Sequence, residues 1–162
     1  YSACGARIGS IASKNKDLMK QILKLAQARL CAPLLEQVGA TSFTTVPEEY
    51  IINSQIEYKK RRDLVYQALS KMDGVVCHKP QGAFYMVVKL PVENAEDFIV
   101  WLLSDFSIDN ETVFLAPAAG FYGTEGLGLD EVRISYCINQ ESLKKAMNIL
   151  SEGLKEYNKI RK

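Results

Sequence analysis

The sequence predicts an α+β domain in which helices pack on one side of a mostly antiparallel sheet. Over residues 73–162, short apolar strands alternate with amphipathic helices, and the strands have hairpin-like spacing. A long helical pattern over residues 47–72 precedes them. The chain has 162 residues, of which 48% are hydrophobic, so it is long enough to build a packed core.

The first part of the chain predicts an amphipathic helix. Asn15 and Asp17 offer a helix start, and leucines and isoleucines then recur at the helical period over residues 16–30. Pro33 either ends this helix or opens a second, short one through Leu34 and Val38 to Gly39.

The long helix over residues 47–72 has Pro47 in its first turn and stops at Asp73-Gly74. Its two ends are apolar, but its middle, from Glu57 to Asp63, reads EYKKRRD. A helix that is apolar at both ends and charged in the middle is typical of a bridge between two domains. The KKRR run could instead bind nucleic acid, although such runs are more often a solvated helix face.

Four strands and two further helices follow. Strands are predicted at residues 75–77, 83–88, 112–116 and 131–137, and helices after Asn94 and Asn139. The last strand alternates strictly, with Val132, Ile134 and Tyr136 on one face and Arg133, Ser135 and Cys137 on the other.

Composition excludes several classes of function. A formal charge of +1 gives no general case for nucleic acid or an acidic membrane surface, and no apolar run is long enough to cross a bilayer. The four cysteines form no CxxC pair, which favours reduced thiols in a cytoplasmic protein. We therefore expect no metal site, and we expect His78, the single histidine, to be a surface or structural residue.

Two arginines are candidates for binding an anion. Arg7 lies among glycine and alanine residues, where a ligand can approach the backbone closely. Arg133 lies in the middle of a strand, where its guanidinium needs a carboxylate or phosphate partner. From spacing alone, an internal ion pair and a bound ligand are equally good explanations for Arg133.

A glycine-rich loop from Gly120 to Gly128 precedes the last strand. It contains neither GxGxxG nor GKS/T, and a strand rather than a helix follows it, so the sequence does not predict a phosphate-binding loop. Tight turns or a flexible lid are the better interpretation.

Three motifs in series resemble one known family. Ser2, Ala3, Gly5, Arg7, Ile8 and Gly9 match, in register, the segment that follows the Schiff-base lysine of class I/II (fold type I) pyridoxal-phosphate-dependent aminotransferases, the aspartate aminotransferase group. Pro80 to Tyr85 (PQGAFY) matches the family's Pro-x-Gly-Ala-Phe-Tyr. Ala116-Pro117, the glycine-rich loop and Arg133-Ile134-Ser135 match its third motif. The resemblance covers essentially the whole chain.

The resemblance implies pyridoxal 5'-phosphate as the cofactor, with Arg7 contacting its phosphate. It implies that Arg133 grips the substrate α-carboxylate as a bidentate pair, and that Tyr85 and the glycine-rich loop lie near the substrate entrance. The implied reaction moves an amino group between an amino acid, aspartate-type or related, and a 2-oxo acid. A pyridoxal-phosphate lyase or synthase of the same fold, or a non-catalytic scaffold that reuses the small domain, are the alternatives.

The resemblance also implies a division of the chain and a partner. Residues 1–46 would end the large cofactor-binding domain, residues 47–72 would form the bridging helix, and residues 73–162 the small C-terminal domain. The Schiff-base lysine is expected two residues before Tyr1, so we expect no catalytic residue in this chain and no activity without the upstream large domain. Lys14 and Lys16 lie on the far side of Arg7 and cannot replace that lysine. The full-length protein is expected to be a cytoplasmic homodimer.

Overall fold

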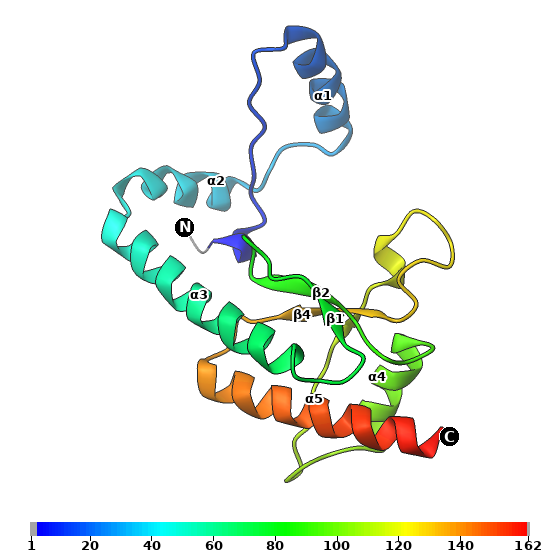
Figure 1. Ribbon diagram of the computed structural model, residues 1–162. Coiled ribbons are helices and arrows are strands. Elements are labelled where there is room, and N and C mark those ends of the chain that lie inside the picture. Colours follow the sequence, from blue (N-terminus) through cyan, green and yellow to red (C-terminus); the bar gives the residue numbers. More distant parts are fainter. Residues whose placement is uncertain (1–2, 162) are drawn as a thin grey trace. The chain divides into compact units, whose positions relative to one another are not determined.

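A computed structural model describes residues 3–161 of the chain (Figure 1). Ser2, one of the residues that match the aminotransferase pattern, lies outside the described residues, as does Tyr1. The chain divides into an N-terminal unit that extends to Asn53 and a C-terminal unit that begins at Ser54.

The N-terminal unit consists of short helices. Its elements are a 3-10 helix at Cys4–Ala6, α1 at Lys16–Ala28, α2 at Leu34–Ala40, a second 3-10 helix at Thr41–Thr45 and the first turns of α3 at Glu48–Leu69. The Asn15 side chain accepts a hydrogen bond from the Leu18 amide at 3.0 Å, which caps the start of α1 as predicted. The helices predicted at residues 16–30 and 47–72 are confirmed, with ends displaced by up to three residues, and Pro33 opens the second, short helix α2.

The C-terminal unit contains an antiparallel sheet of four strands in the order β1-β2-β4-β3. The strands are β1 at Val76–Cys77, β2 at Tyr85–Lys89, β3 at Ala116–Pro117 and β4 at Glu131–Ser135. In the central pair, Met86 lies opposite Ile134 and Val87 opposite Arg133. Side chains alternate between a buried and an exposed face along both strands.

The α-helices of the C-terminal unit pack on the buried face of the sheet. Helix α4 at Ala95–Ser104, helix α5 at Gln140–Ile160 and the end of α3 pack there (Figure 1). Asn94 and Asn139 cap α4 and α5 with their side-chain oxygens, as the sequence predicts. The core joins residues from α3, the sheet, α4 and α5: Val65, Leu69, Met86, Val88, Phe98, Leu102, Val132, Ile134, Tyr136, Leu143, Met147, Leu150, Leu154 and Tyr157 are among them. This arrangement confirms the predicted α+β class.

The strand predicted at residues 112–116 is largely wrong. Only Ala116 of that segment pairs in the sheet, opposite Arg133, and β3 ends at Pro117. Val113 and Leu115 are buried in the core without strand pairing. The apolar pattern therefore predicted burial correctly, but burial does not require a partner strand. In the described residues, no helix combines the length and apolar character needed to span a membrane.

Candidate functional site

Arg133 lies on the exposed face of the sheet, in the middle of β4. The centre of its guanidinium is 5.2 Å from the centroid of the Tyr85 ring and 4.9 Å from that of the Phe121 ring. No Asp or Glu of the described chain forms an ion pair with it. The internal ion pair that spacing alone left open is therefore not formed within the described residues.

Two elements on either side of β4 bring these rings to Arg133. Tyr85 begins β2, where it lies opposite Ser135, one diagonal step from Arg133. Phe121 ends the 3-10 helix Ala119–Phe121, which follows β3 on the other side of β4. The predicted neighbourhood of Arg133, Tyr85 and the glycine-rich loop is therefore present. We call Arg133, Tyr85 and Phe121 the arginine clamp.

The arginine clamp holds a cation without neutralising it. An aromatic ring attracts a guanidinium through its face but offers no strong acceptor for the N–H groups. Those N–H groups remain able to donate two parallel hydrogen bonds to a carboxylate. The clamp is therefore suited to bind a carboxylate at the exposed face of the sheet.

Tight turns shape the glycine-rich loop. Gly126 and Gly128 have φ angles of 85° and 71°, which favour glycine over other residues. A Cβ atom on Gly128 would also clash with the Tyr122 ring. The Tyr122 hydroxyl donates a hydrogen bond to the Glu131 carboxylate, which fixes the loop to the start of β4. Because β4 rather than a helix follows, the loop offers no helix N-terminus to a phosphate, as predicted.

Arg7 follows the 3-10 helix Cys4–Ala6 and has a left-handed backbone with φ of 54°. Its side chain is exposed, and its Nη1 donates one long hydrogen bond of 3.4 Å to the carbonyl of Cys4. A Cβ atom on Gly5 or Gly9 would meet no other atom within 4 Å, so the backbone on both sides is open. The Arg7 guanidinium has no acidic partner in the described chain, and the backbone beside it is open. Such a group is suited to bind a phosphate. Arg7 and Arg133 belong to different units, and each is placed only within its own.

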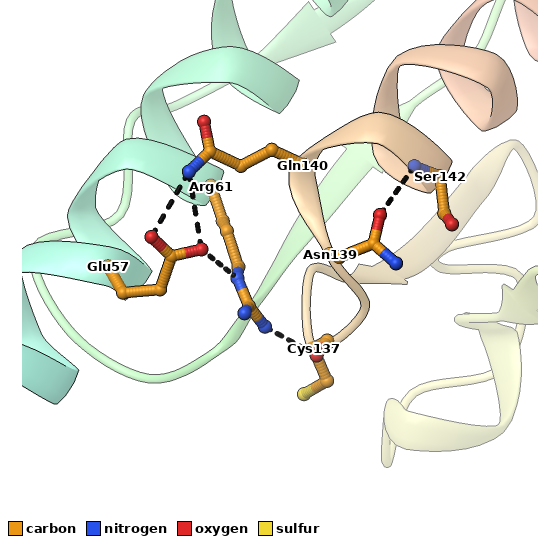
Figure 2. Close-up of polar contacts among 6 residues, drawn as sticks. All are labelled: Glu57, Arg61, Cys137, Asn139, Gln140 and Ser142. Atoms are coloured by element: carbon orange, nitrogen blue, oxygen red, sulfur yellow. Dashed lines mark hydrogen bonds and ion pairs between the residues drawn. The ribbon is translucent and has the colours of Figure 1, made fainter.

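The charged middle of α3 contains a cluster that sequence reasoning missed (Figure 2). Arg61 Nε lies 2.8 Å from Glu57 Oε1, and Arg61 Nη1 donates to the Cys137 carbonyl at 2.6 Å. Gln140 Nε2 donates to both Glu57 oxygens at 3.2 and 3.1 Å. These bonds from Arg61 and Gln140 lower the pKa of Glu57 from its ordinary value. The Glu57 cluster therefore ties α3 to the end of β4 and the start of α5.

A second ion pair fixes the next turn of α3. Arg62 Nη2 and Lys79 Nζ lie 2.7 and 2.9 Å from Asp63 Oδ1, and Arg62 Nη1 donates to the Pro80 carbonyl. Hydrogen bonds from Lys79 and Arg62 lower the pKa of Asp63. Both arginines of the KKRR run are engaged in these structural contacts, whereas Lys59 and Lys60 are exposed on the helix face. No sequence signal showed that segments so distant in the chain would supply the partners.

The remaining candidates form no further site in the described chain. His78 is exposed, which confirms a surface position for the single histidine. The four cysteines are free thiols, and burial raises the pKa of the Cys77 thiol. Residues 3–161 contain no group of three or more His, Cys, Asp or Glu side chains that could hold a metal ion.

Comparison with known proteins agrees with the resemblance. The family model described as aminotransferase class I and II matches residues 1–150. An aspartate aminotransferase of Sulfurisphaera tokodaii is 27% identical over 94% of this chain, and a probable aspartate/prephenate aminotransferase of Rickettsia conorii is 31% identical over 90%. A solved Methanococcus jannaschii protein, whose active site is similar to those of kynurenine aminotransferases, is 31% identical over 95% of this chain, with a TM-score of 0.73.

This chain spans only part of each of these proteins. It covers 38% and 37% of the two curated relatives and 39% of the solved Methanococcus jannaschii chain. The family match, by contrast, extends over nearly all of the chain and includes Arg7, the arginine clamp and the glycine-rich loop. The chain therefore belongs to the class I and II aminotransferase family.

Proposed function

We propose that the chain is the C-terminal part of a pyridoxal-phosphate-dependent aminotransferase. The complete enzyme moves an amino group between an amino acid, aspartate-type or related, and a 2-oxo acid. The observation that carries this proposal is the arginine clamp, a guanidinium with no acidic partner in the described chain, held between two aromatic rings. Every amino acid and every 2-oxo acid presents the carboxylate that such a group recognises.

Arg133 binds the α-carboxylate in this proposal. A bidentate pair with the guanidinium edge fixes two atoms of the carboxylate and therefore orients the adjacent carbon. Both substrates carry the same carboxylate, so one arginine serves both halves of the reaction. Tyr85 and Phe121 hold the guanidinium and border the place where the substrate enters.

Arg7 binds the phosphate of the cofactor. Its guanidinium is exposed, has no acidic partner in the described chain and is flanked by Gly5 and Gly9, which leave room for an anion to reach the backbone. The chemistry that pyridoxal phosphate supplies, when bound, is that of an electron sink for the reacting carbon. The lysine that binds the cofactor covalently is proposed to lie upstream of Tyr1, so this chain contributes binding and orientation.

The proposal includes the organisation of the complete protein. Residues 1–46 end the large cofactor-binding domain, residues 47–72 bridge the two domains, and residues 73–162 form the small domain. We further propose a cytoplasmic homodimer acting in amino-acid biosynthesis. The helix that would form the bridge, α3, begins in the N-terminal unit and continues into the C-terminal unit, which supports that role.

The test is an amino-transfer assay on the complete protein with Arg133→Ala and Arg133→Lys. We expect Arg133→Ala to raise KM for the amino acid about 100-fold or more, because a charged bidentate pair contributes several kcal/mol. Arg133→Lys keeps a positive charge but cannot donate two parallel hydrogen bonds to the carboxylate. It should therefore recover only part of the substrate affinity that Arg133→Ala loses. An unchanged KM in Arg133→Ala would rule out the carboxylate assignment.

A further inference from the structure

The ring of Phe121 reaches Arg133 from the turn that follows β3, where the Ala118 amide donates a hydrogen bond to the Glu131 carbonyl at 2.9 Å. Phe121 is 59% exposed, so packing against a core does not fix its position. The residue that follows it, Tyr122, donates its hydroxyl hydrogen bond to Glu131, two residues before Arg133 on β4. The loop that carries Phe121 is thus fastened to the strand that carries Arg133.

Two further observations describe how this attachment is built. Gly128 is the residue at which a side chain would strike the Tyr122 ring, so the loop passes close against that ring. The hydrogen bond to Glu131 raises the pKa of Tyr122 above its ordinary value, so the hydroxyl stays protonated and can donate at neutral pH.

We propose that the Tyr122–Glu131 hydrogen bond is a latch that sets the carboxylate affinity of Arg133 by holding the Phe121 ring against its guanidinium. The inference rests on the proposed function, in which Arg133 binds the substrate carboxylate. Tyr122 and Glu131 are positioning residues in this account, because they act on the substrate carboxylate only through Phe121 and Arg133.

The physical reason is the freedom of the arginine side chain. An exposed arginine has several rotamers, and fixing them on binding a ligand reduces the affinity. Rings on two sides restrict the guanidinium before the ligand arrives and leave its N–H donors available. If the latch opens, the Ala118 amide still holds the start of the turn, but the Phe121 ring gains freedom to move away from the guanidinium, so that binding has to order the Arg133 side chain.

The test uses the complete enzyme and the variant Tyr122→Phe, which removes one hydroxyl and keeps the ring. Two substrates are compared, an amino acid and the amine that lacks its α-carboxylate, and the steady-state rate of amino transfer from each is measured over a range of concentrations to give KM and kcat. We expect KM for the amino acid to rise about three- to tenfold with kcat within about twofold, as for the loss of one charge-assisted hydrogen bond. The reaction of the amine should not change, because it makes no use of Arg133.

Companion variants separate the latch from a general loss of structure. Glu131→Gln keeps a hydrogen-bond acceptor and should retain most of the affinity, whereas Gly128→Ala displaces the Tyr122 ring and should reproduce the effect of Tyr122→Phe. Tyr157→Phe is the matched control, since the Tyr157 hydroxyl is buried with no partner in the described chain. Tyr157→Phe should leave KM and kcat unchanged for both the amino acid and the amine.

Two results would overturn the latch. In the first, Tyr122→Phe leaves the KM for the amino acid unchanged while Arg133→Ala raises it. This result would reject the latch and leave the proposed function in place. The other is an equal loss of activity toward the amino acid and the amine, which would show a structural role only. An unchanged KM in Arg133→Ala would instead reject the proposed function and the latch together.

Discussion

Every buried hydrophobic residue of the described chain lies in the C-terminal unit, whereas the N-terminal unit has none. In the N-terminal unit, Leu25, Leu30 and Leu35 are 70%, 82% and 83% exposed. Both units contain amphipathic helices with good caps, so local sequence preference is similar in the two. What differs is the presence of a sheet on which the apolar helix faces can pack.

The two units therefore differ in the source of their stability. In the C-terminal unit, burial of apolar side chains offsets the conformational entropy lost on folding. Within this chain, the helices of the N-terminal unit rely on propensity, caps and hydrogen bonds, which seldom suffice for short helices in water. The large domain proposed to lie upstream would give their apolar faces a surface on which to pack. The two arginines follow this division, with Arg133 on a packed sheet and Arg7 beside a 3-10 helix.

The largest expected effect comes from a matched pair of Leu→Ala variants. Leu150 on α5 is fully buried, and Leu150→Ala should lower the free energy of unfolding by about 2–5 kcal/mol. Leu25→Ala on α1 removes a side chain that is mostly exposed and should change it by less than about 0.5 kcal/mol. Urea unfolding of the 162-residue chain, followed by far-ultraviolet circular dichroism, which reports on the helices of both units, measures both. Equal effects would contradict the difference between the units.

Two glycine variants should change stability in opposite directions. A Cβ atom on Gly153 of α5 would lie 2.7 Å from Leu102 Cδ2, so Gly153→Ala should cost about 1–3 kcal/mol. A Cβ atom on Gly39 of α2 would meet nothing within 4 Å, and Gly39→Ala should favour that helix by up to about 1 kcal/mol. Urea midpoints test the first and far-ultraviolet circular dichroism tests the second. A stabilising Gly153→Ala would mean that the contact between α5 and α4 is looser than described.

The two N-caps offer a smaller and sharper comparison. Asn139 Oδ1 accepts from the Ser142 amide at 2.8 Å, and Asn139→Ala should lower the free energy of unfolding by about 1 kcal/mol (Figure 2). Asn15→Ala removes the corresponding cap of α1 and should reduce helicity without moving the cooperative transition. A shift of the transition in Asn15→Ala would show that α1 unfolds together with the core.

The smallest effect is the pH dependence due to Glu57. Its pKa is lowered from its ordinary value of 4.5 by the bonds from Arg61 and Gln140. Because the pKa of Glu57 is lower in the folded state, the charged carboxylate stabilises the fold at pH values above 4.5. This stabilisation is lost as the pH falls through the lowered pKa. The difference in unfolding midpoint between the wild type and Glu57→Gln should therefore shrink below pH 4.5.

The sequence predicted the parts of the fold that depend on local signals. Asn15, Asn94 and Asn139 marked the starts of α1, α4 and α5, and the alternation in β4 placed Arg133 on the exposed face. The strand prediction for residues 112–116 was largely wrong, because apolar side chains indicate burial but do not identify a partner strand. Strand pairing depends on a neighbouring strand that the local sequence does not identify.

The candidate site could be predicted only in part, for the same reason. The motifs identified Arg7 and Arg133 as residues to examine, but the rings around Arg133 depend on the register of β2 against β4 and on the turn after β3. Arg61 and Glu57 lie one turn apart on α3, but the Cys137 carbonyl and the Gln140 side chain that bind them come from segments far along the chain. Contacts of that kind come from the fold and leave no pattern in the local sequence.

The central proposal is that Arg7 binds the cofactor phosphate and that Arg133 binds the substrate carboxylate. Equilibrium dialysis of the complete protein against pyridoxal 5'-phosphate tests it most directly, with Arg7→Ala and Arg133→Ala compared side by side. The account predicts that Arg7→Ala weakens retention of the cofactor by about tenfold or more, as for the loss of a charge-assisted contact, and that Arg133→Ala retains it like the wild type. Loss of the cofactor in Arg133→Ala, or unchanged retention in Arg7→Ala, would contradict the claim.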